Sequence, residues 1–255
     1  MHIGSMSWRE LEGRLAAGDP PAVLVPLGAV EAHGPHLPLD TDSIIATHLA
    51  GVASERLAAA GVTTTCSPCL PFSVAAWAAG FPGTVSIRED EERSLLTEAL
   101  DALGRRAVTR VAFVNLHFDP AHMRVVQAVV EERRASGLAG LVFPDFTRRR
   151  HAQRIGGEFA TGACHGGQFE TSMVLAVEPA KVGAAFRTLA PLHVDLAAAI
   201  REGKASFRDV GMTQAYCGNP AAASAEEGAR LYRELAAIVA EECLAAWSPA
   251  SAPSP

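Results

Sequence analysis

The sequence predicts an α/β fold, in which a mostly parallel β-sheet lies between layers of helices. Short apolar segments alternate along the chain with longer segments of helical periodicity, and this alternation is typical of parallel sheets. The chain has 255 residues, of which 49% are hydrophobic, so it can bury a large core without disulfides. We expect a single-domain three-layer sandwich over residues 1–247, followed by a disordered Pro/Ser/Ala tail at 248–255.

Apolar spacing and helix-ending residues place the elements of the first half. Trp8, Leu11 and Leu15 share one helix face, and a Gly-Asp-Pro-Pro run ends that helix. The apolar run AVLVPL reads as a buried strand, and Asp42 can cap the next helix. We expect helices at 8–17, 42–57 and 91–107, and strands at 22–27 and 62–66.

The second half repeats the same alternation. The run RVAFVN reads as a buried strand, and Pro120 suits the first turn of the helix that follows it. We expect strands at 110–115 and 138–143, and helices at 121–134, 168–177 and 225–247. Two long loops rich in Gly and Pro, at 28–41 and 67–88, interrupt the pattern, and loops of this length are often functional.

Charge, hydropathy and cysteine content exclude several classes of protein. The net charge of −6 argues against a nucleic-acid partner, which usually requires a basic surface. No apolar run reaches the roughly 20 residues of a membrane span, and no secretory signal is visible. The five cysteines are an odd number, which favours reduced thiols and a cytoplasmic location. A catalytic Cys164 is disfavoured, because adjacent residues such as Cys164 and His165 rarely face each other.

Polar side chains concentrate where the expected strands end. Open α/β sheets bind ligands at the carboxyl ends of their strands, so these segments are the places to search. The loop after the first strand carries three carboxylates and two imidazoles within 15 residues. The chain after the third strand reads NLHFDPAH, and a later segment reads HGGQFETS. Five of the nine histidines fall in these segments, namely His33, His36, His117, His122 and His165.

The spacing of these groups predicts a site for one or two metal ions. Glu31-x-His33 and His117-x-Asp119 each place two side chains on one side of an extended segment. Imidazole and carboxylate ligands together suit Zn, Mn, Fe or Co. Asp42 is a natural bridging carboxylate, although it can equally serve only as a helix cap. His36 and His122 can equally serve only to orient the loops.

Five segments in the same order resemble the creatininase (creatinine amidohydrolase) family over roughly residues 20–235. The most specific is VPLGAVEAHGPHLPLDTD at 25–42, which is similar to the Gly-x-x-Glu-x-His-Gly-Pro-His-Leu-Pro signature of that family. The weaker segments are FPGT at 81–84, VNLHFD at 114–119, HGGQFETS at 165–172 and YCGNP at 216–220. The resemblance implies a creatininase-like sandwich with a dinuclear centre of Zn, Mn or Fe ions. It also implies a homo-oligomer, typically a hexamer.

The resemblance also implies roles for individual residues. Glu31 and His117 would hold one metal, His33 and Asp119 would hold the other, and Asp42 would bridge them. His165 would face the substrate and transfer protons, and Asp119 or a neighbouring carboxylate would take the proton of the attacking water. Glu170 falls on the Glu of the family's Glu-Thr-Ser segment, which implies a supporting or ligand role.

We therefore expect metal-assisted hydrolysis of a C–N bond in a small amide, lactam or formamide. Known members of the family act on creatinine, on a formamido-pyrimidine and on a short peptide in redox-cofactor (mycofactocin-type) maturation. The apolar segment at 70–80 favours a hydrophobic or aromatic amide as the substrate, although Trp77 can equally pack in an oligomer interface. Leu116 and Asp119 depart from the family pattern. They motivate a second hypothesis, a catalytically impaired binding or assembly protein.

Overall fold

The computed structural model of this protein describes residues 3–17, 20–105, 108–162 and 165–247. Cys164 and the expected tail at 248–255 lie outside these ranges. Within the described residues, four parallel strands form one sheet in the order β2–β1–β3–β4. They are β1 (Ala22–Leu27), β2 (Thr64–Cys66), β3 (Arg110–Asn115) and β4 (Gly140–Val142). The predicted α/β fold with a parallel sheet is confirmed.

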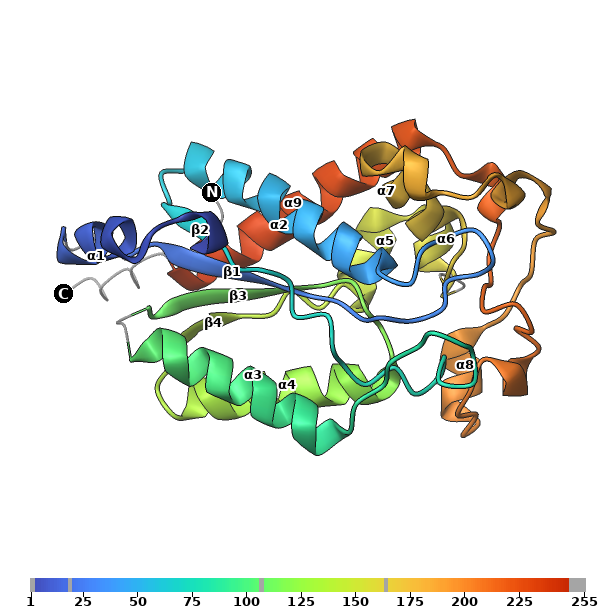
Figure 1. Cartoon of the computed structure of the whole chain (residues 1–255), viewed down its shortest axis with the longest axis horizontal. Coiled ribbons are helices and arrows are strands. Elements are labelled where there is room, and N and C mark those ends of the chain that lie inside the picture. The colour runs from blue at the N-terminus through green and yellow to red at the C-terminus, as the bar shows by residue number, and fades with distance from the viewer. Residues whose placement is uncertain (1–2, 18–19, 106–107, 163–164, 248–255) are drawn as a thin grey trace.

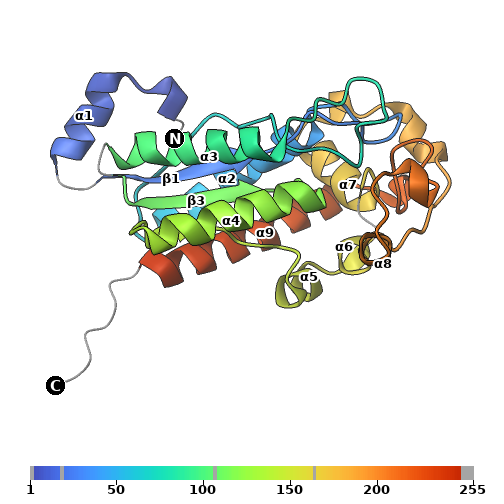
Figure 2. The same cartoon turned by 90° about the horizontal axis from the view of Figure 1, so that it is seen from below.

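Helices cover both faces of the sheet (Figures 1 and 2). One layer contains α2 (Thr41–Ala59) and α9 (Ala225–Trp247), with α7 (Gln168–Val177) packed against both. The other layer contains α3 (Glu89–Gly104) and α4 (Pro120–Ala135), which pack against each other. This arrangement is the expected three-layer sandwich.

Alternate side chains of each strand enter opposite layers. Leu24 and Val114 belong to the core beneath α2 and α9, whereas Val23, Val25 and Phe113 belong to the core beneath α3 and α4. Side chains of a strand alternate between the two faces of its sheet, so a sheet covered on both faces needs apolar residues throughout. That requirement explains the continuous apolar runs of the sequence.

The structure differs from the sequence-based expectation mainly in short elements. Strands β2 and β4 are shorter than expected, and α3 begins at Glu89 instead of residue 91 because its first turn is acidic throughout, which suits the positive end of a helix. Three helices of four to seven residues, at 149–155, 157–160 and 196–201, were not predicted, since they are too short to show periodicity. The remaining helices are α1 (Trp8–Ala16), α5 (Arg149–Ile155), α6 (Gly157–Ala160) and α8 (Leu196–Arg201), and the 3₁₀ turns are Ile3–Ser5, Pro179–Lys181, Ala184–Thr188, Arg208–Val210 and Pro220–Ala222.

The two central strands end side by side. Leu27, the last residue of β1, is in register with Asn115, the last residue of β3. The loops that follow these strands therefore leave the sheet together and meet on the same side. Among the described residues, none of the helices is both long and apolar enough to span a membrane.

Candidate metal centre

Close packing after β1 brings the first turn of α2 next to the polar loop. A Cβ atom at Gly28 would lie 2.8 Å from the backbone nitrogen of Ser43, so only glycine permits this approach. The N-cap of α2 is Asp40, and Asp42 lies inside the first turn. The alternative reading of Asp42 as the helix cap is therefore wrong. Its carboxylate is free to turn towards the loop that carries Glu31.

Six buried side chains converge at this point, and Asp42 lies between two histidines. Its Oδ1 atom is 3.2 Å from His33 Nε2, and its Oδ2 atom is 3.2 Å from His117 Nδ1. The Oε1 atom of Glu31 is 3.1 Å from His117 Nδ1, and the Oε2 atom of Glu170 is 3.7 Å from His33 Nε2. Three sets with metal-ligand spacing result: Glu31, Asp42 and His117; His33, Asp42 and Glu170; and Glu31, His33 and His165.

The three imidazoles are oriented by backbone carbonyl groups. A carbonyl oxygen only accepts hydrogen bonds, so the ring nitrogen beside it must carry the proton. The opposite nitrogen of each ring then presents its lone pair to the cluster, as metal-binding histidines do. The proton donors and their acceptors are His33 Nδ1 to Glu31 O (3.1 Å), His117 Nε2 to Val74 O (2.8 Å) and His165 Nε2 to Ala32 O (2.8 Å).

The donor set fits divalent cations. His33 Nε2, His117 Nδ1 and Asp42 Oδ2 are buried and have no hydrogen-bond partner within the described part of the chain. Buried polar atoms are normally satisfied, and buried carboxylates need a compensating positive charge. Three buried carboxylates and three oriented imidazole nitrogens supply the oxygen and nitrogen ligands that Zn and Mn accept. The coarser expectation, a cluster able to bind metal, is confirmed.

Without a cation, the site has to bind protons instead. Burial alone would lower the pKa of His33, but the carboxylates of Asp42 and Glu170 outweigh it and raise the pKa to about 10. Burial raises the pKa of Glu170 to about 8, against the attraction of His33. The pKa of Asp42 is lowered, since His33 and His117 overcome its desolvation. These pKa shifts show that the buried site stabilises bound positive charge.

Asp119 lies apart from the three ligand sets found among the described residues. It is the N-cap of α4, where its Oδ1 atom accepts a hydrogen bond from the Ala121 amide at 2.8 Å. Its Oδ2 atom accepts the Trp77 amide at 3.0 Å. Glu170 therefore stands beside His33 where Asp119 was expected. The Asp-Pro pair that begins α4 is itself a helix-capping signal, which could have revealed this role in the sequence.

His165 forms one wall of the cluster. Its ring stacks on His33 with centroids 4.4 Å apart and packs against Phe207 at 4.2 Å. Burial and the neighbouring His33 lower the pKa of His165 to about 4. The imidazole is therefore neutral at pH 7. Its Nδ1 atom lies 3.9 Å from Glu31 Oε1.

The two remaining histidines of the strand-end segments orient their surroundings. His36 Nε2 lies 2.8 Å from the Thr171 hydroxyl on α7. His122 bonds Asn115 Oδ1 at 3.0 Å through Nε2 and Glu92 Oε1 through Nδ1. The sequence did not single out Glu92, which comes from α3 and also accepts the Val74 amide at 3.1 Å.

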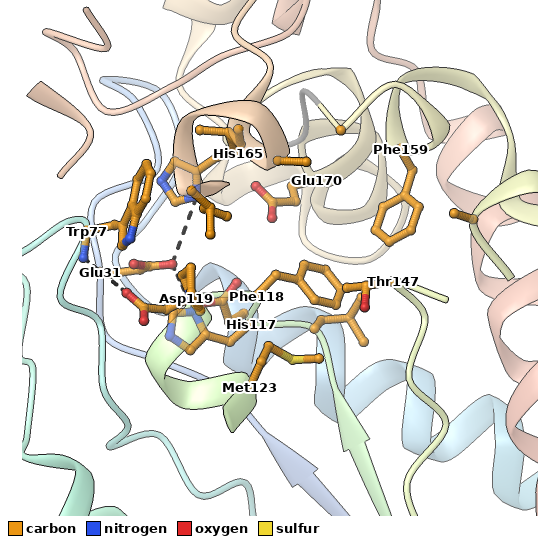
Figure 3. A pocket seen from close by; sticks show the side chains of 18 of the residues that line it. Glu31, Trp77, His117, Phe118, Asp119, Met123, Thr147, Phe159, His165 and Glu170 are labelled. Carbon is orange, nitrogen blue, oxygen red and sulfur yellow. Dashed lines mark hydrogen bonds and ion pairs between the residues drawn. The ribbon is translucent and has the colours of Figure 1, made fainter. Parts of the chain in front are cut away.

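A cavity of about 410 Å³ opens from the cluster. In Figure 3, Glu31 and His117 lie across from His165 and Glu170, while Phe118, Phe159 and Thr147 extend the wall away from them. Most of the lining is apolar, and Trp77 lies at the side nearest the cluster. The apolar members of the lining include Leu116, Phe118, Met123, Phe159, Leu196, Ile200 and Phe207.

Comparison with known proteins agrees with this geometry. Residues 4–243 match the family described as Creatininase: Creatinine amidohydrolase. The chain belongs to the creatininase family. It is 33% identical to the mycofactocin precursor peptide peptidase of Mycobacterium ulcerans over 244 residues, which cover 90% of this chain and 86% of the relative. It is 28% identical to the creatinine amidohydrolase of Pseudomonas putida, covering 69% of this chain and 72% of the relative.

Solved creatininase structures share the fold. The crystal structure of creatinine amidohydrolase superposes with a TM-score of 0.73 at 23% identity, covering 97% of this chain and 98% of that one. One similar structure is described as creatininase with Mn and another, a mutant, as Zn-Zn type. As a creatininase-family member with a cluster of metal-ligand type, this protein is a metal-dependent amidohydrolase.

Proposed function

We propose that this creatininase-family protein hydrolyses an amide bond in a short peptide, next to a bulky apolar or aromatic side chain. The observation that carries the proposal is the continuity of the ligand cluster with a largely apolar cavity. Volumes of roughly 300–1,000 Å³ are typical of cavities that enclose a drug-sized ligand. At about 410 Å³, this cavity can take a side chain and adjoining backbone as well as the scissile bond.

We assign two divalent cations to the cluster, of Zn, Mn or Fe. Glu31, Asp42 and His117 would hold one of them, and His33, Asp42 and Glu170 would hold the other. Asp42 supports this assignment because its two oxygens face different histidines. Bound cations of this kind supply a hydrolytic nucleophile at neutral pH and polarise the carbonyl group of the substrate.

We assign proton transfer to His165. Its Nδ1 atom is unprotonated at pH 7, faces the cluster and can take the proton of the attacking water. The resulting imidazolium keeps its Nε2 hydrogen bond to Ala32 and lies 3.9 Å from the Glu31 carboxylate, which stabilises its charge. It can then pass the proton from Nδ1 to the departing nitrogen. Both oxygens of Asp119 already accept backbone amides, so we assign it to holding Trp77 in the cavity wall.

The relatives favour a peptide over creatinine as the substrate. Several curated mycobacterial relatives, at 31–33% identity, are mycofactocin precursor peptide peptidases, whereas the creatinine amidohydrolase is 28% identical. The apolar lining suits a hydrophobic side chain better than a small polar ring. A creatinine-like lactam is the second candidate, because the family includes that activity.

A loading and hydrolysis experiment tests the proposal. The purified protein is stripped with chelator, reloaded separately with Zn, Mn or Fe, and assayed on creatinine and on short peptides that place Phe, Tyr, Gly or Ser beside each bond. We expect about two ions per chain and cleavage that prefers Phe or Tyr. Well under one ion per chain would instead support the impaired binding protein, and turnover of creatinine alone would support the lactam.

Assembly and location remain predictions. We propose a homo-oligomer, a hexamer by family resemblance, and a cytoplasmic location. Exposed apolar side chains support the assembly: Trp8 is 65% exposed and Phe72 is 50% exposed. Light scattering coupled to size-exclusion chromatography measures the oligomer, and a monomeric mass at micromolar concentration would overturn the proposed assembly.

A further inference from the structure

Glu158 joins two segments that lie behind the candidate metal centre. It belongs to the four-residue helix α6, and its carboxylate is partly buried. Its Oε2 atom accepts the Phe169 amide at 2.9 Å, and its Oε1 atom accepts the Asn219 amide at 2.6 Å. One carboxylate therefore fastens the start of α7 to the segment around residues 217–219.

Each of these segments determines the position of a side chain in the cluster. Glu170 follows Phe169 directly in the first turn of α7. On the other side, the Cys217 amide donates to the backbone oxygen of His165 at 2.7 Å, which fixes the backbone from which that imidazole extends. The amide of Gly166 also donates to Glu170 Oε2 at 2.5 Å. Glu170 and His165 are thus linked through the backbone that Glu158 holds.

The start of α7 has no space for a local capping side chain. Gly167 is its N-cap and offers no side-chain hydrogen bond. A Cβ atom there would lie 2.3 Å from Glu158 Oε2 and 2.5 Å from the Cys217 carbonyl oxygen. Serine, threonine or aspartate, which usually cap helices, cannot be accommodated at this position. The Glu158 carboxylate, which belongs to α6, accepts the Phe169 amide hydrogen bond that a cap would accept. It also connects α7 to the segment at residues 217–219.

We propose that Glu158 is a positioning residue, which holds Glu170 and His165 in register so that the cation at His33, Asp42 and Glu170 binds tightly. This inference rests on the proposed two-cation centre. Residues that orient metal ligands typically contribute about 10- to 100-fold to metal affinity, although they do not touch the ion. A residue that only stabilised α6 would not affect one cation more than the other.

The test measures the affinity of each cation separately. Zn²⁺ is titrated against a chromophoric chelator in the wild-type protein, Glu158→Gln and Glu170→Gln, and Co²⁺ spectra report the ligand environment. We expect Glu158→Gln to weaken one of the two Zn²⁺ ions about 10- to 100-fold and to leave the other within about threefold. Glu170→Gln should weaken the same ion. Glu241→Gln, which removes an exposed ion pair with Arg154, is the matched control and should bind both ions normally.

The outcomes separate this inference from the proposed function. If the wild-type chain binds two ions and Glu158→Gln binds both equally well, the positioning role is wrong and the two-cation centre stands. Equal weakening of both ions also overturns it, because that result indicates a general structural effect. A wild-type chain that binds no Zn²⁺ overturns both ideas. If Glu158→Gln does not fold, Glu158→Asp, with its shorter reach, is judged by the same comparison.

Discussion

Removal of the cations should make the folded protein progressively less stable between pH 6 and pH 8. In the metal-free site, burial raises the pKa of Glu170 from its ordinary value of 4.5 to about 8. The pKa of His33 rises from 6.5 to about 10, because Asp42 and Glu170 outweigh its burial. Both groups hold a proton in the folded state that the unfolded chain releases. Their stabilisation is complete below pH 4.5 and 6.5, respectively, and is lost as the pH rises through about 8 and about 10.

The size of the effect follows from the number of protons involved. Each proton held only by the folded state lowers the free energy of unfolding by about 1.4 kcal/mol per pH unit. Glu170 alone accounts for about 2.3 kcal/mol between pH 6 and pH 8, because it is already half deprotonated at pH 8, and His33 adds about 2 kcal/mol. His165 and His36, whose pKa values burial lowers to about 4, each offset about 0.8 kcal/mol of this loss, since the unfolded chain releases their protons over the same range. A net loss of about 3 kcal/mol corresponds to a fall in Tm of roughly 6–12 °C for a domain of this size.

Differential scanning calorimetry of chelator-stripped protein, at intervals of half a pH unit, measures this slope. The same samples reloaded with Zn²⁺ should melt at a higher temperature and show no such fall, since the bound cation replaces the protons. Glu170→Gln, which cannot titrate at this position, should have a smaller slope than the stripped wild-type protein. A stripped protein whose Tm stays constant or rises from pH 6 to pH 8 would refute the reasoning.

Five further substitutions test separate parts of the structure. Asp42→Asn should lose both ions and reduce activity by more than the roughly 100-fold that outer-shell changes cause, as metal analysis and turnover will show. Asp119→Asn should keep both ions, since asparagine also caps helices; loss of an ion would make Asp119 a ligand. Ile200→Ala, at the cavity rim, should raise KM about fivefold for peptides with a bulky apolar residue and leave glycine peptides unchanged. Gly228→Ala would bring a Cβ within 2.0 Å of a carbonyl of α7, so urea unfolding should show a loss of about 1–3 kcal/mol or more. Gly51→Ala, which meets nothing within 4 Å in α2, should instead be stabilising by about 0.5–1 kcal/mol.

The sequence predicted the parts of the site that depend on the sheet. Two neighbouring parallel strands in register end at the same edge of the sheet. The side chains of the loops that follow Leu27 and Asn115 therefore lie close together. Glu31, His33 and His117 follow directly from that rule. Apolar periodicity also predicted the long helices, because each buries one face against the sheet over many residues.

The parts that depend on tertiary contacts were not predictable in the same way. The place of Glu170 beside His33 is set by α7, whose position depends on α9 and on the distant Glu158. Nothing in the local sequence around Glu158 indicates that its carboxylate caps another helix. Helix α8 has six residues, too few for a periodic pattern, yet Leu196 and Ile200 line the cavity. Pocket walls built from short elements are therefore the least predictable part of this protein.

The two departures from the family pattern bear on whether the site is impaired. Leu116 is 1% exposed, joins the core beneath α2 and α9, and also lines the cavity. It adds apolar surface beside the cluster without displacing a donor. Asp119 makes its contacts with backbone amides, and the three ligand sets found among the described residues are complete without it. Both substitutions alter the walls that a substrate would touch, and neither removes a group that would bind a cation. We infer that they redirect substrate choice in an active hydrolase, which is the reason to expect a bulky apolar substrate in place of creatinine.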